Sequence, residues 1–377
     1  MPAQPSSHPD RLDGIDLLRG LAILLVLLNH VNMRLLFAKV PYTAGLPAQL
    51  VSSLVWNGQR GVQIFFAVSG FLITSVTLRR WSPLAQINVR AFYRIRFARI
   101  APLLILLLAV LSALDLCHVP DFVINPKTGG LGRALLAALT FHINVLEARH
   151  GYLPANWDIL WSLSVEEVFY LFFPLLCWML GRSKALVGIL CLFVVLGPLA
   201  RSVFSTGNEV WYEYSYLGGM DAIALGCLTA KLVSTLEFSR QTRLILTIVG
   251  LATLTANLCL SLRINALGLK QNGLDMTILA VGACMLIAVA AQSRWRSPII
   301  LAPIIRLGQR SYEIYLTHVF IVFALFHLFL NAGKPMNAVL PLFLATIVLA
   351  GITGEVVARY YSEPLNRILR SAPTVNY

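Results

Sequence analysis

Apolar stretches of about 20 residues recur along this 377-residue chain, and no other feature constrains its fold as strongly. A helix of that length, rising about 1.5 Å per residue, crosses the roughly 30 Å hydrocarbon core of a lipid bilayer. Charged residues make up only 12% of the chain, against roughly a quarter in a typical soluble domain. The sequence therefore predicts an all-α fold: a polytopic transmembrane helical bundle in a lipid bilayer.

About ten stretches are long enough to span a membrane. A further apolar run, 131–146, is shorter and contains His142 and Asn144. An eleventh span there would reverse every later connection and place most of the following arginines outside, against the positive-inside rule. We therefore expect about ten spans with both termini cytoplasmic, and 131–146 lying on or dipping into the outer face. The expected spans are 15–36, 58–78, 100–117, 161–180, 185–202, 214–233, 243–262, 274–291, 311–330 and 338–360.

The net charge of +13 comes largely from Lys and Arg residues that flank these spans. Such residues set membrane topology, so the charge calls for no nucleic-acid partner. The arginine-rich connection 79–99 is expected on the cytoplasmic side. Within it, apolar and basic residues alternate over 84–99, which predicts a separate interfacial helix leading into the third span.

The domain organisation is simple. Residues 1–10 are rich in Pro and Ser and predict a disordered cytoplasmic tail. A single membrane domain is expected over 11–365, followed by a cytoplasmic tail over 366–377. No polar stretch is long enough for a second domain.

Polar residues inside the apolar runs are costly in lipid and are expected to face protein or water. Arg19 lies at the entrance of the first span, and His30 lies roughly 20 Å across it, in the outer half. Gln63 and Glu166 fall near the outer ends of their spans, so a histidine and a carboxylate share one level of the membrane. His318 is expected roughly 10–12 Å from the cytoplasmic face.

Two chemistries fit this pattern. A histidine beside a carboxylate acts as a general base or covalent acceptor, and arginines at a channel mouth hold phosphates. Arg19, Arg96 and Arg99 form such a cationic mouth. The same residues would also serve a proton-coupled transporter. Taken singly, each has a plainer explanation: the arginines as topology signals, and the carboxylates as residues that favour a helix start.

Six motifs occur in a fixed order between about residues 11 and 365. Together they make the chain resemble the acyltransferase-3 family of bacterial integral-membrane acyltransferases. They are Arg19 with His30 in an R-x10-H arrangement, the stretch 61–73, Arg96 and Arg99 in an RxxR arrangement, the stretch 161–170 with Glu166 and Glu167, the stretch 220–226 with Asp221, and the stretch 311–318 ending in His318.

The resemblance implies transfer of an acyl group, usually acetyl, from cytoplasmic acyl-CoA to a hydroxyl on a surface glycan or membrane-linked acceptor. It implies essential roles for Arg19, His30, Arg96, Arg99 and Glu166. In two places the chain departs from the pattern. Many members have Asp where this chain has Gln63, which cannot serve as a base. Many also carry an Arg immediately before the Asp of the stretch 220–226, whereas here Gly219 and Met220 precede Asp221.

These observations lead to one expected mechanism. His30 and Glu166 form the catalytic site, with His30 either deprotonating the acceptor or carrying the acyl group. Arg19, Arg96 and Arg99 bind acyl-CoA, a donor substrate and not a permanently bound cofactor. Acceptor-binding roles fall to the polar residues Gln63, Glu167, Asp221 and His318.

No metal is expected in this site. The location expected for the protein is the bacterial cytoplasmic (inner) membrane. Two other interpretations stay open: a glycan or lipid transporter with His30 and Glu166 as a proton relay, and a structural partner in polysaccharide assembly. The sequence leaves the acceptor, the acyl group and the oligomeric state undetermined.

Overall fold

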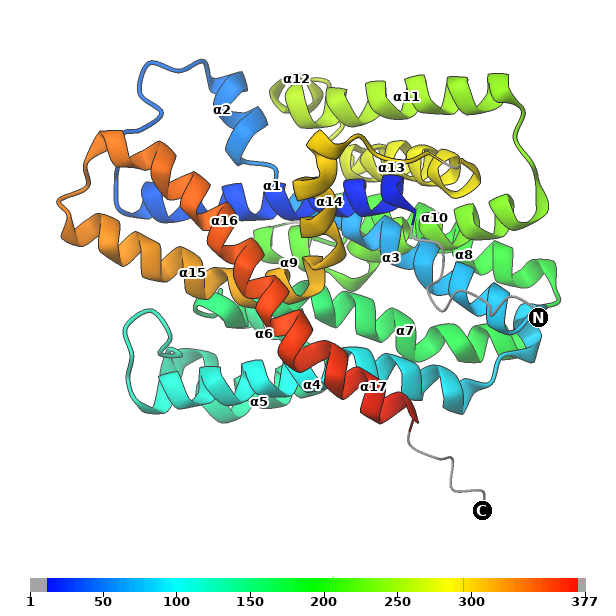
Figure 1. Ribbon diagram of the computed structural model, residues 1–377, viewed down its shortest axis with the longest axis horizontal. Coiled ribbons are helices and arrows are strands. Elements are labelled where there is room, and N and C mark those ends of the chain that lie inside the picture. The colour runs from blue at the N-terminus through cyan, green and yellow to red at the C-terminus, as the bar shows by residue number, and fades with distance from the viewer. Residues whose placement is uncertain (1–11, 206, 294, 372–377) are drawn as a thin grey trace, which may run out of the picture.

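The computed structural model describes residues 12–205, 207–293 and 295–371, and every regular element within them is a helix. Ten of these helices, or runs of helices, are long and apolar enough to cross a membrane, which confirms the predicted bundle of about ten spans. Figure 1 shows the long helices lying side by side along one axis of the molecule. They are α1 (Asp13–Phe37), α3 (Gly58–Arg80), α4 (Val89–Leu116), α7 (Leu160–Leu180), α8 (Lys184–Ser202), α10 (Tyr216–Thr235), α11 (Arg240–Cys259), α13 (Leu274–Gln292), α15 (Ser311–Asn331) and α16 (Val339–Val357).

Short helices form the connections and extend two of the spans. The α-helical ones are α2 (Ala48–Val55), α5 (Gly130–Leu139), α6 (Ile143–His150), α9 (Glu209–Tyr214), α12 (Ser261–Ala266), α14 (Ala302–Gln309) and α17 (Glu363–Ser371). The single-turn elements are η1 (Leu84–Gln86), η2 (Pro126–Thr128), η3 (Ala155–Trp157), η4 (Ile299–Leu301) and η5 (Met336–Ala338), and η6 (Ala358–Ser362) is a π-helical turn between α16 and α17. Because α17 continues to Ser371, the expected tail 366–377 begins inside a helix, and the expected tail 1–10 lies outside the described residues.

The apolar run 131–146 is not an eleventh span. It divides into α5 and α6, separated by Thr140–His142. Ten residues of helix in α5 extend only about 15 Å, half the thickness of the hydrocarbon core. This agrees with the placement of Lys and Arg residues, which argued in the sequence against a span here.

The prediction of a separate interfacial helix over 84–99 is wrong. α4 begins at Val89 and runs without a break to Leu116, so the arginines of this segment form the first turns of a spanning helix. Phe92 is buried there, with its ring 6.0 Å from that of Phe173 in α7. The alternation of apolar and basic residues therefore reflects packing of this helix end against α7.

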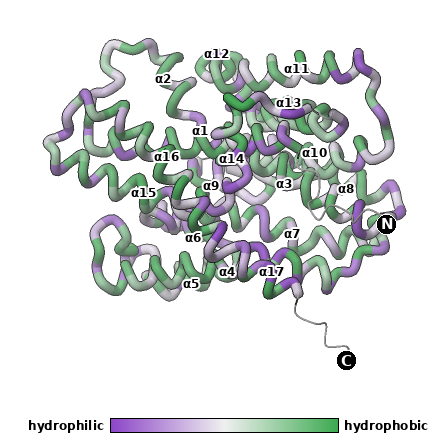
Figure 2. Tube along the Cα trace, viewed as in Figure 1, coloured by the Kyte–Doolittle hydropathy of each residue, from purple (hydrophilic) through white to green (hydrophobic). Residues whose placement is uncertain are grey.

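Two helices, α3 and α10, form the centre of the bundle and are its most enclosed spans. Glycines let them touch: a Cβ added at Gly70 would lie 1.9 Å from the carbonyl oxygen of Ile223, and one at Gly226 would lie 2.1 Å from that of Ala67. Small residues at helix contacts allow this close approach inside membranes. Figure 2 shows the apolar character that continues outward along peripheral helices such as α5 and α11.

α14 lies across α1, so α15 begins inside the bundle (Figure 1). The crossing is close, because a Cβ on Gly308 would lie 1.8 Å from the carbonyl oxygen of Asp16 and one on Gly20 would lie 2.0 Å from that of Ile304. Ser311, the first residue of α15, accepts a hydrogen bond from Arg19 at 2.9 Å. His318 lies at the level of His30, since their ring centroids are 4.7 Å apart, so the different depths predicted for these two residues do not hold together.

Candidate active site

A cavity of about 360 Å³, here called the inner cavity, lies between α1, α3, α4, α7 and α15. It brings together four of the residues singled out from the sequence: Arg19, Arg96, Arg99 and Glu166. Each of them lies near the end or in the middle of a long helix. They converge because α4 packs against α7, and α15 packs against both α1 and α4. Tyr170, Tyr312 and Tyr315 contribute polar aromatic side chains to the walls.

The three arginines are each compensated by a nearby carboxylate. Arg19 lies 3.3 Å from Asp16, and Arg96 lies 3.5 Å from Glu167, the residue predicted to bind the acceptor. Buried cations require such partners because their desolvation is costly.

Arg99 lies 3.2 Å from Glu313, which is itself almost fully buried. Aromatic rings add further contacts: the guanidinium of Arg96 lies 3.8 Å from the centre of the Tyr170 ring, and that of Arg99 lies 5.1 Å from the Tyr312 ring. These contacts orient both cations at the wall of the inner cavity.

Glu166 faces the arginine side of the inner cavity. It accepts a hydrogen bond from Ser69 and lies within electrostatic range of Arg96 and Arg19. Among the described residues, no hydrogen bond, ion pair or ring contact joins Glu166 to His30. The carboxylate therefore belongs with the cations at this level of the bundle.

His30 instead meets His318. Their rings contact edge to face, with centroids 4.7 Å apart. The Nδ1 of His30 lies 2.9 Å from the carbonyl oxygen of Val26, and the Nδ1 of His318 lies 2.7 Å from that of Tyr315. Because a carbonyl oxygen only accepts, each Nδ1 carries a proton, and in the neutral form of either ring the lone pair then lies on Nε2.

The Nε2 of His318 is buried and has no hydrogen-bond partner in the described part of the chain. The ring of Tyr315, which lines the inner cavity, lies 5.9 Å from the His318 ring. The Tyr315 hydroxyl donates to the carbonyl oxygen of Ile159 at 3.0 Å and lies 2.7 Å from the Ser162 hydroxyl. Tyr315 therefore connects the histidine pair to the cavity.

Gln63 and Asp221 lie side by side, but in a closed network of their own. Gln63 donates to Asp221 at 2.9 Å, Arg201 of α8 contacts the same carboxylate at 2.7 Å, and Thr277 donates to it at 2.5 Å. Arg201 also donates to the carbonyl oxygen of Gly273 at 2.8 Å. Neither Gln63 nor Asp221 lines the inner cavity.

Sequence reasoning missed Arg201 and Glu313. Arg201 supplies from α8 a cation for Asp221, at whose own motif the resemblance had led us to expect an arginine and the chain has Gly219 and Met220. An arginine inside the apolar run 184–202 was visible in the sequence, as was Glu313 inside the last recognisable motif. Their partners were not visible, because each pair joins different helices.

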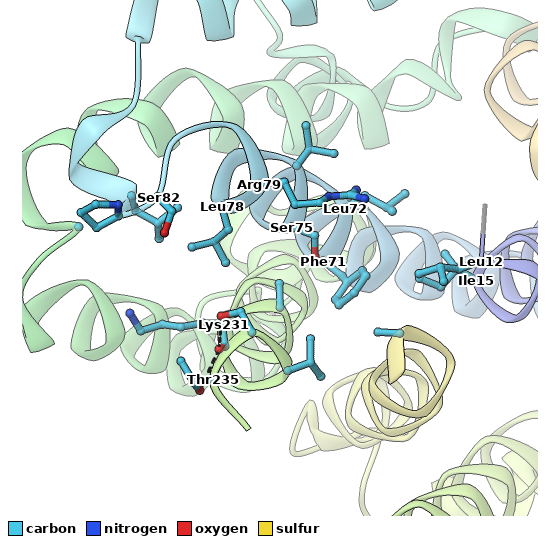
Figure 3. A pocket seen from close by; sticks show the side chains of 18 of the residues that line it. Leu12, Ile15, Phe71, Leu72, Ser75, Leu78, Arg79, Ser82, Lys231 and Thr235 are labelled. Atoms are coloured by element: carbon cyan, nitrogen blue, oxygen red, sulfur yellow. Dashed lines mark hydrogen bonds between the residues drawn. The ribbon is translucent and has the colours of Figure 1, made fainter. Parts of the chain in front are cut away.

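A second hollow opens at the end of the bundle where α1 begins and α3, α7 and α10 end. Its volume is about 740 Å³, and we call it the basic groove. Figure 3 shows Ser75 and Arg79 of α3 on one wall and Lys231 and Thr235 of α10 on another. Arg19 lines both hollows.

A carboxyl pair lies outside the spans, where α6 meets the segment before α7. Glu147 is fully buried and accepts a hydrogen bond from the Leu153 backbone at 3.0 Å, and it lies within hydrogen-bond range of Asp158. Tyr214 donates to Asp158 at 3.1 Å. Burial raises the pKa of Asp158 to about 6, although hydrogen bonds to Tyr214 and Glu147 oppose the shift. Burial, together with the nearby charge of Asp158, raises the pKa of Glu147 well above its ordinary value.

A metal site would need several ligating side chains to lie close together. Within residues 12–205, 207–293 and 295–371, no three His, Cys, Asp or Glu side chains come together in a group that could hold a metal ion. The arrangement offers a histidine pair next to a cavity lined by arginines. It is suited to proton transfer and to binding an anionic substrate.

The sequence is also similar to those of curated proteins named as O-acetyltransferases. The chain is 24% identical over 371 residues to the O-acetyltransferase OatA of Staphylococcus aureus (strain NCTC 8325 / PS 47), covering 95% of this chain and 58% of that protein. It is also 24% identical over 372 residues to the putative O-acetyltransferase SACOL0978 of S. aureus (strain COL), covering 94% of this chain and 57% of that protein. The chain thus spans less than two thirds of the length of these curated relatives. No solved structure matches significantly.

The model of the family described as "Acyltransferase domain" matches residues 12–355, which include the ten helices long enough to cross a membrane, apart from the C-terminal end of the last run. The match contains the inner cavity, apart from Arg370, and the histidine pair. On this evidence the chain belongs to the acyltransferase-3 family of membrane acyltransferases.

Proposed function

We propose that this protein is an O-acetyltransferase that moves an acyl group, acetyl in the first instance, from cytoplasmic acyl-CoA to a hydroxyl of a surface glycan or membrane-linked acceptor. The observation that carries the proposal is the contact between His30 and His318 beside a cavity lined by Arg19, Arg96 and Arg99. The naming of two relatives as O-acetyltransferases supports the same reaction. The location that follows is the bacterial inner membrane, with the arginine-lined end toward the cytoplasm.

In this mechanism the donor thioester reaches past the arginines toward the histidine pair. His30 takes the proton of the acceptor hydroxyl on its free Nε2. The hydroxyl oxygen attacks the thioester carbonyl, a C–O bond forms, the C–S bond breaks, and the proton passes from His30 to the departing CoA thiolate. An acyl group carried briefly on His30 gives the same balance in two steps.

The other residues support this chemistry from the walls. Glu166 and Glu167 set the position of the Arg96 guanidinium and the net charge of its surroundings. Arg96 in turn contacts the donor. His318 keeps the His30 ring in place and offers its own Nε2 to the acceptor. Gln63 and Asp221 hold α3 and α10 in register around the site through their network with Arg201, and in this way they support acceptor binding.

The test uses purified protein, radiolabelled acetyl-CoA and an envelope preparation from a strain lacking the gene. We expect acetyl transfer and matching release of free CoA, and at least a hundredfold loss in His30→Ala, because general-base catalysis contributes on the order of 10²–10⁴ in rate. Full activity of His30→Ala at normal expression would remove the proposal.

A transporter of a glycan or lipid, with His30 and Glu166 as a proton relay, is the rival function. It predicts movement of the acceptor without CoA release. CoA release that falls in Arg96→Gln and Arg99→Gln supports the enzyme. Acceptor flux with no CoA release in the wild-type protein supports the transporter.

A further inference from the structure

The basic groove is joined to the inner cavity. Arg19, Leu72 and Val76 line both hollows, so the two share a wall along α1 and α3. The groove lies nearer the end of the bundle where α3 and α10 finish, as Figure 3 shows from the positions of Arg79 and Thr235. A long ligand entering from this end would pass the groove before reaching the inner cavity.

The groove carries positive charge that no carboxylate among the described residues offsets. Within the described part of the chain, Asp16 is the only acidic residue of the lining, and it is paired with Arg19. In the part of the chain that the structure describes, neither Arg79 nor Lys231 has an Asp or Glu within ion-pair distance. Lys231 is partly buried and Arg79 is exposed, so one cation lies within the groove and the other at its edge.

Three of the four arginines that line the inner cavity differ in this respect, whereas the fourth, Arg370 of α17, has no carboxylate within ion-pair distance in the described part of the chain. Arg96 and Arg99 already have carboxylate partners, Glu167 and Glu313. A phosphate binding to either would have to compete with a carboxylate already in place. Arg79 and Lys231 offer charge without that competition, and cations of this kind are the preferred partners of phosphate oxygens.

The rest of the groove suits a phosphorylated ligand with an uncharged arm. Hydroxyl groups of Ser75, Ser82 and Thr235 lie in its lining and can donate to phosphate oxygens. Phe71 and Leu72 give apolar surface toward the inner cavity. The lining therefore combines basic and hydroxyl groups with apolar surface.

We infer that the basic groove binds the phosphate groups of the donor's nucleotide, with Lys231 and Arg79 as the contacting cations. The uncharged arm of the donor then runs past Arg19 into the inner cavity, and the paired arginines there contact the arm and the thioester. This inference rests on the proposed function and adds to it a separate phosphate subsite. A phospholipid headgroup at the same place would offer the same phosphate chemistry, and the test separates the two sources.

Two donors distinguish phosphate contacts from contacts with the arm: acetyl-CoA, and S-acetyl-pantetheine, which lacks the nucleotide and its phosphates. Lys231→Gln and Arg79→Gln are compared with the wild-type protein and with Arg240→Gln. Arg240 is an exposed cation at the start of α11, and it does not line the groove. CoA affinity is measured by calorimetry, and kcat and KM by release of the free thiol.

Each groove variant is expected to raise the Kd for CoA and the KM for acetyl-CoA roughly five- to tenfold, which is about 1 kcal/mol per cation, with kcat unchanged. With S-acetyl-pantetheine, both variants should match the wild-type protein, and Arg240→Gln should match it with either donor. Wild-type affinity for CoA in both groove variants would overturn the inference while leaving the proposed function intact. A wild-type protein that neither binds CoA nor transfers acetyl would instead overturn the proposed function.

The lipid alternative is tested in nanodiscs of phosphatidylcholine with and without phosphatidylglycerol. Native mass spectrometry counts the lipids that each variant retains. Loss of bound phosphatidylglycerol in Lys231→Gln, with unchanged CoA affinity, would assign the groove to a lipid headgroup and overturn the donor assignment. Loss of CoA affinity with unchanged lipid retention supports it.

Discussion

Glu147 and Asp158 give the protein a pH dependence that arises from two side chains outside the spans. Their carboxyl groups lie within hydrogen-bond range, yet Oε2 of Glu147 has no donor in the described part of the chain. A proton shared between the two carboxyls satisfies both. The facing groups are Tyr214, which donates to Asp158, and Arg34 and Glu213, which lie within electrostatic range.

We predict that this pair makes the protein more stable in mild acid than in base. The pKa of Asp158 is raised to about 6, above its usual value of roughly 4 when unfolded. The stabilisation that comes from protonated Asp158 is therefore fully present below about pH 4, and it is lost as the pH rises through about 6. As the pH rises across this window, we expect the free energy of unfolding to fall by on the order of 1–3 kcal/mol.

Thermal unfolding in detergent between pH 5 and pH 8 checks this prediction. Asp158→Asn should flatten the profile and raise Tm at pH 8, whereas Glu237→Gln, at an exposed site in the α10–α11 connection, should leave the profile unchanged. An identical pH profile in the wild-type protein and Asp158→Asn would contradict the shared proton.

The Arg201–Asp221 pair should behave as one unit. Both side chains are buried, and removing one leaves the other as an uncompensated charge, which costs about 3–5 kcal/mol. We predict severe loss of folded protein for Arg201→Met, and a smaller combined loss for Arg201→Met with Asp221→Leu than the sum of the single changes.

A double-mutant cycle of folded yield and Tm measures this coupling. Arg263→Met serves as the matched control, because Arg263 lies in the short helix α12 and is exposed. Additive losses in the cycle would show that the two side chains act independently.

At the scale of helices, the crossing of α3 and α10 depends on two glycines. A Cβ at Gly70 or Gly226 would collide with backbone carbonyl oxygens of the other helix, which cannot move away as a flexible side chain could. We predict that Gly70→Ala and Gly226→Ala each lower stability by about 1–3 kcal/mol through overpacking and reduce acetyl transfer, because both helices line or support the site.

Gly188→Ala is the matched control. Gly188 lies in α8, and a Cβ there meets nothing within 4 Å, so alanine should be neutral or slightly stabilising through its better helix propensity. Thermal unfolding and folded yield compare the three variants. Equal stability of all three would show that α3 and α10 are not held at this distance.

α14 decides the level at which α15 starts. By crossing α1 at Asp16 and Gly20, it brings Ser311 to Arg19 and places His318 against His30. The histidine contact is therefore a consequence of how one short helix is inserted between two long ones.

At the scale of the whole molecule, ten spans place the start of α1 and the end of α17 on one side of the bundle. From the positive-inside rule we expect this side to face the cytoplasm. We predict that a cysteine at Glu237, in the connection between α10 and α11, reacts with a membrane-impermeant thiol reagent only after cells are opened.

A cysteine at Lys334, in the connection between α15 and α16, should react in intact cells. Both sites are exposed, so differences in labelling report the side of the membrane and not burial. The reverse pattern would invert the topology, and the donor would then have to approach from outside.

The spans could be predicted closely from the sequence because the bilayer imposes a length and a polarity on each of them. Most observed helix ends fall within a few residues of the predicted ones, and the arginine pattern correctly rejected a span at 131–146. Arg19, Arg96, Arg99 and Glu166 were also identifiable, since charged residues inside apolar runs are costly and therefore stand out. The meeting of the three arginines was expected from their depths, whereas Glu166 was expected at the level of His30 and instead joins the arginines.

The pairings were decided only by the tertiary structure. Depth along a helix is linear in sequence, whereas the direction a side chain faces depends on rotation and crossing angle, which packing sets. His30 meets His318 because α14 crosses α1 and brings the start of α15 to Arg19. Asp221 finds its cation on α8 and Glu147 finds Asp158 across a connection, since long-range contacts of this kind have no sequence period to reveal them.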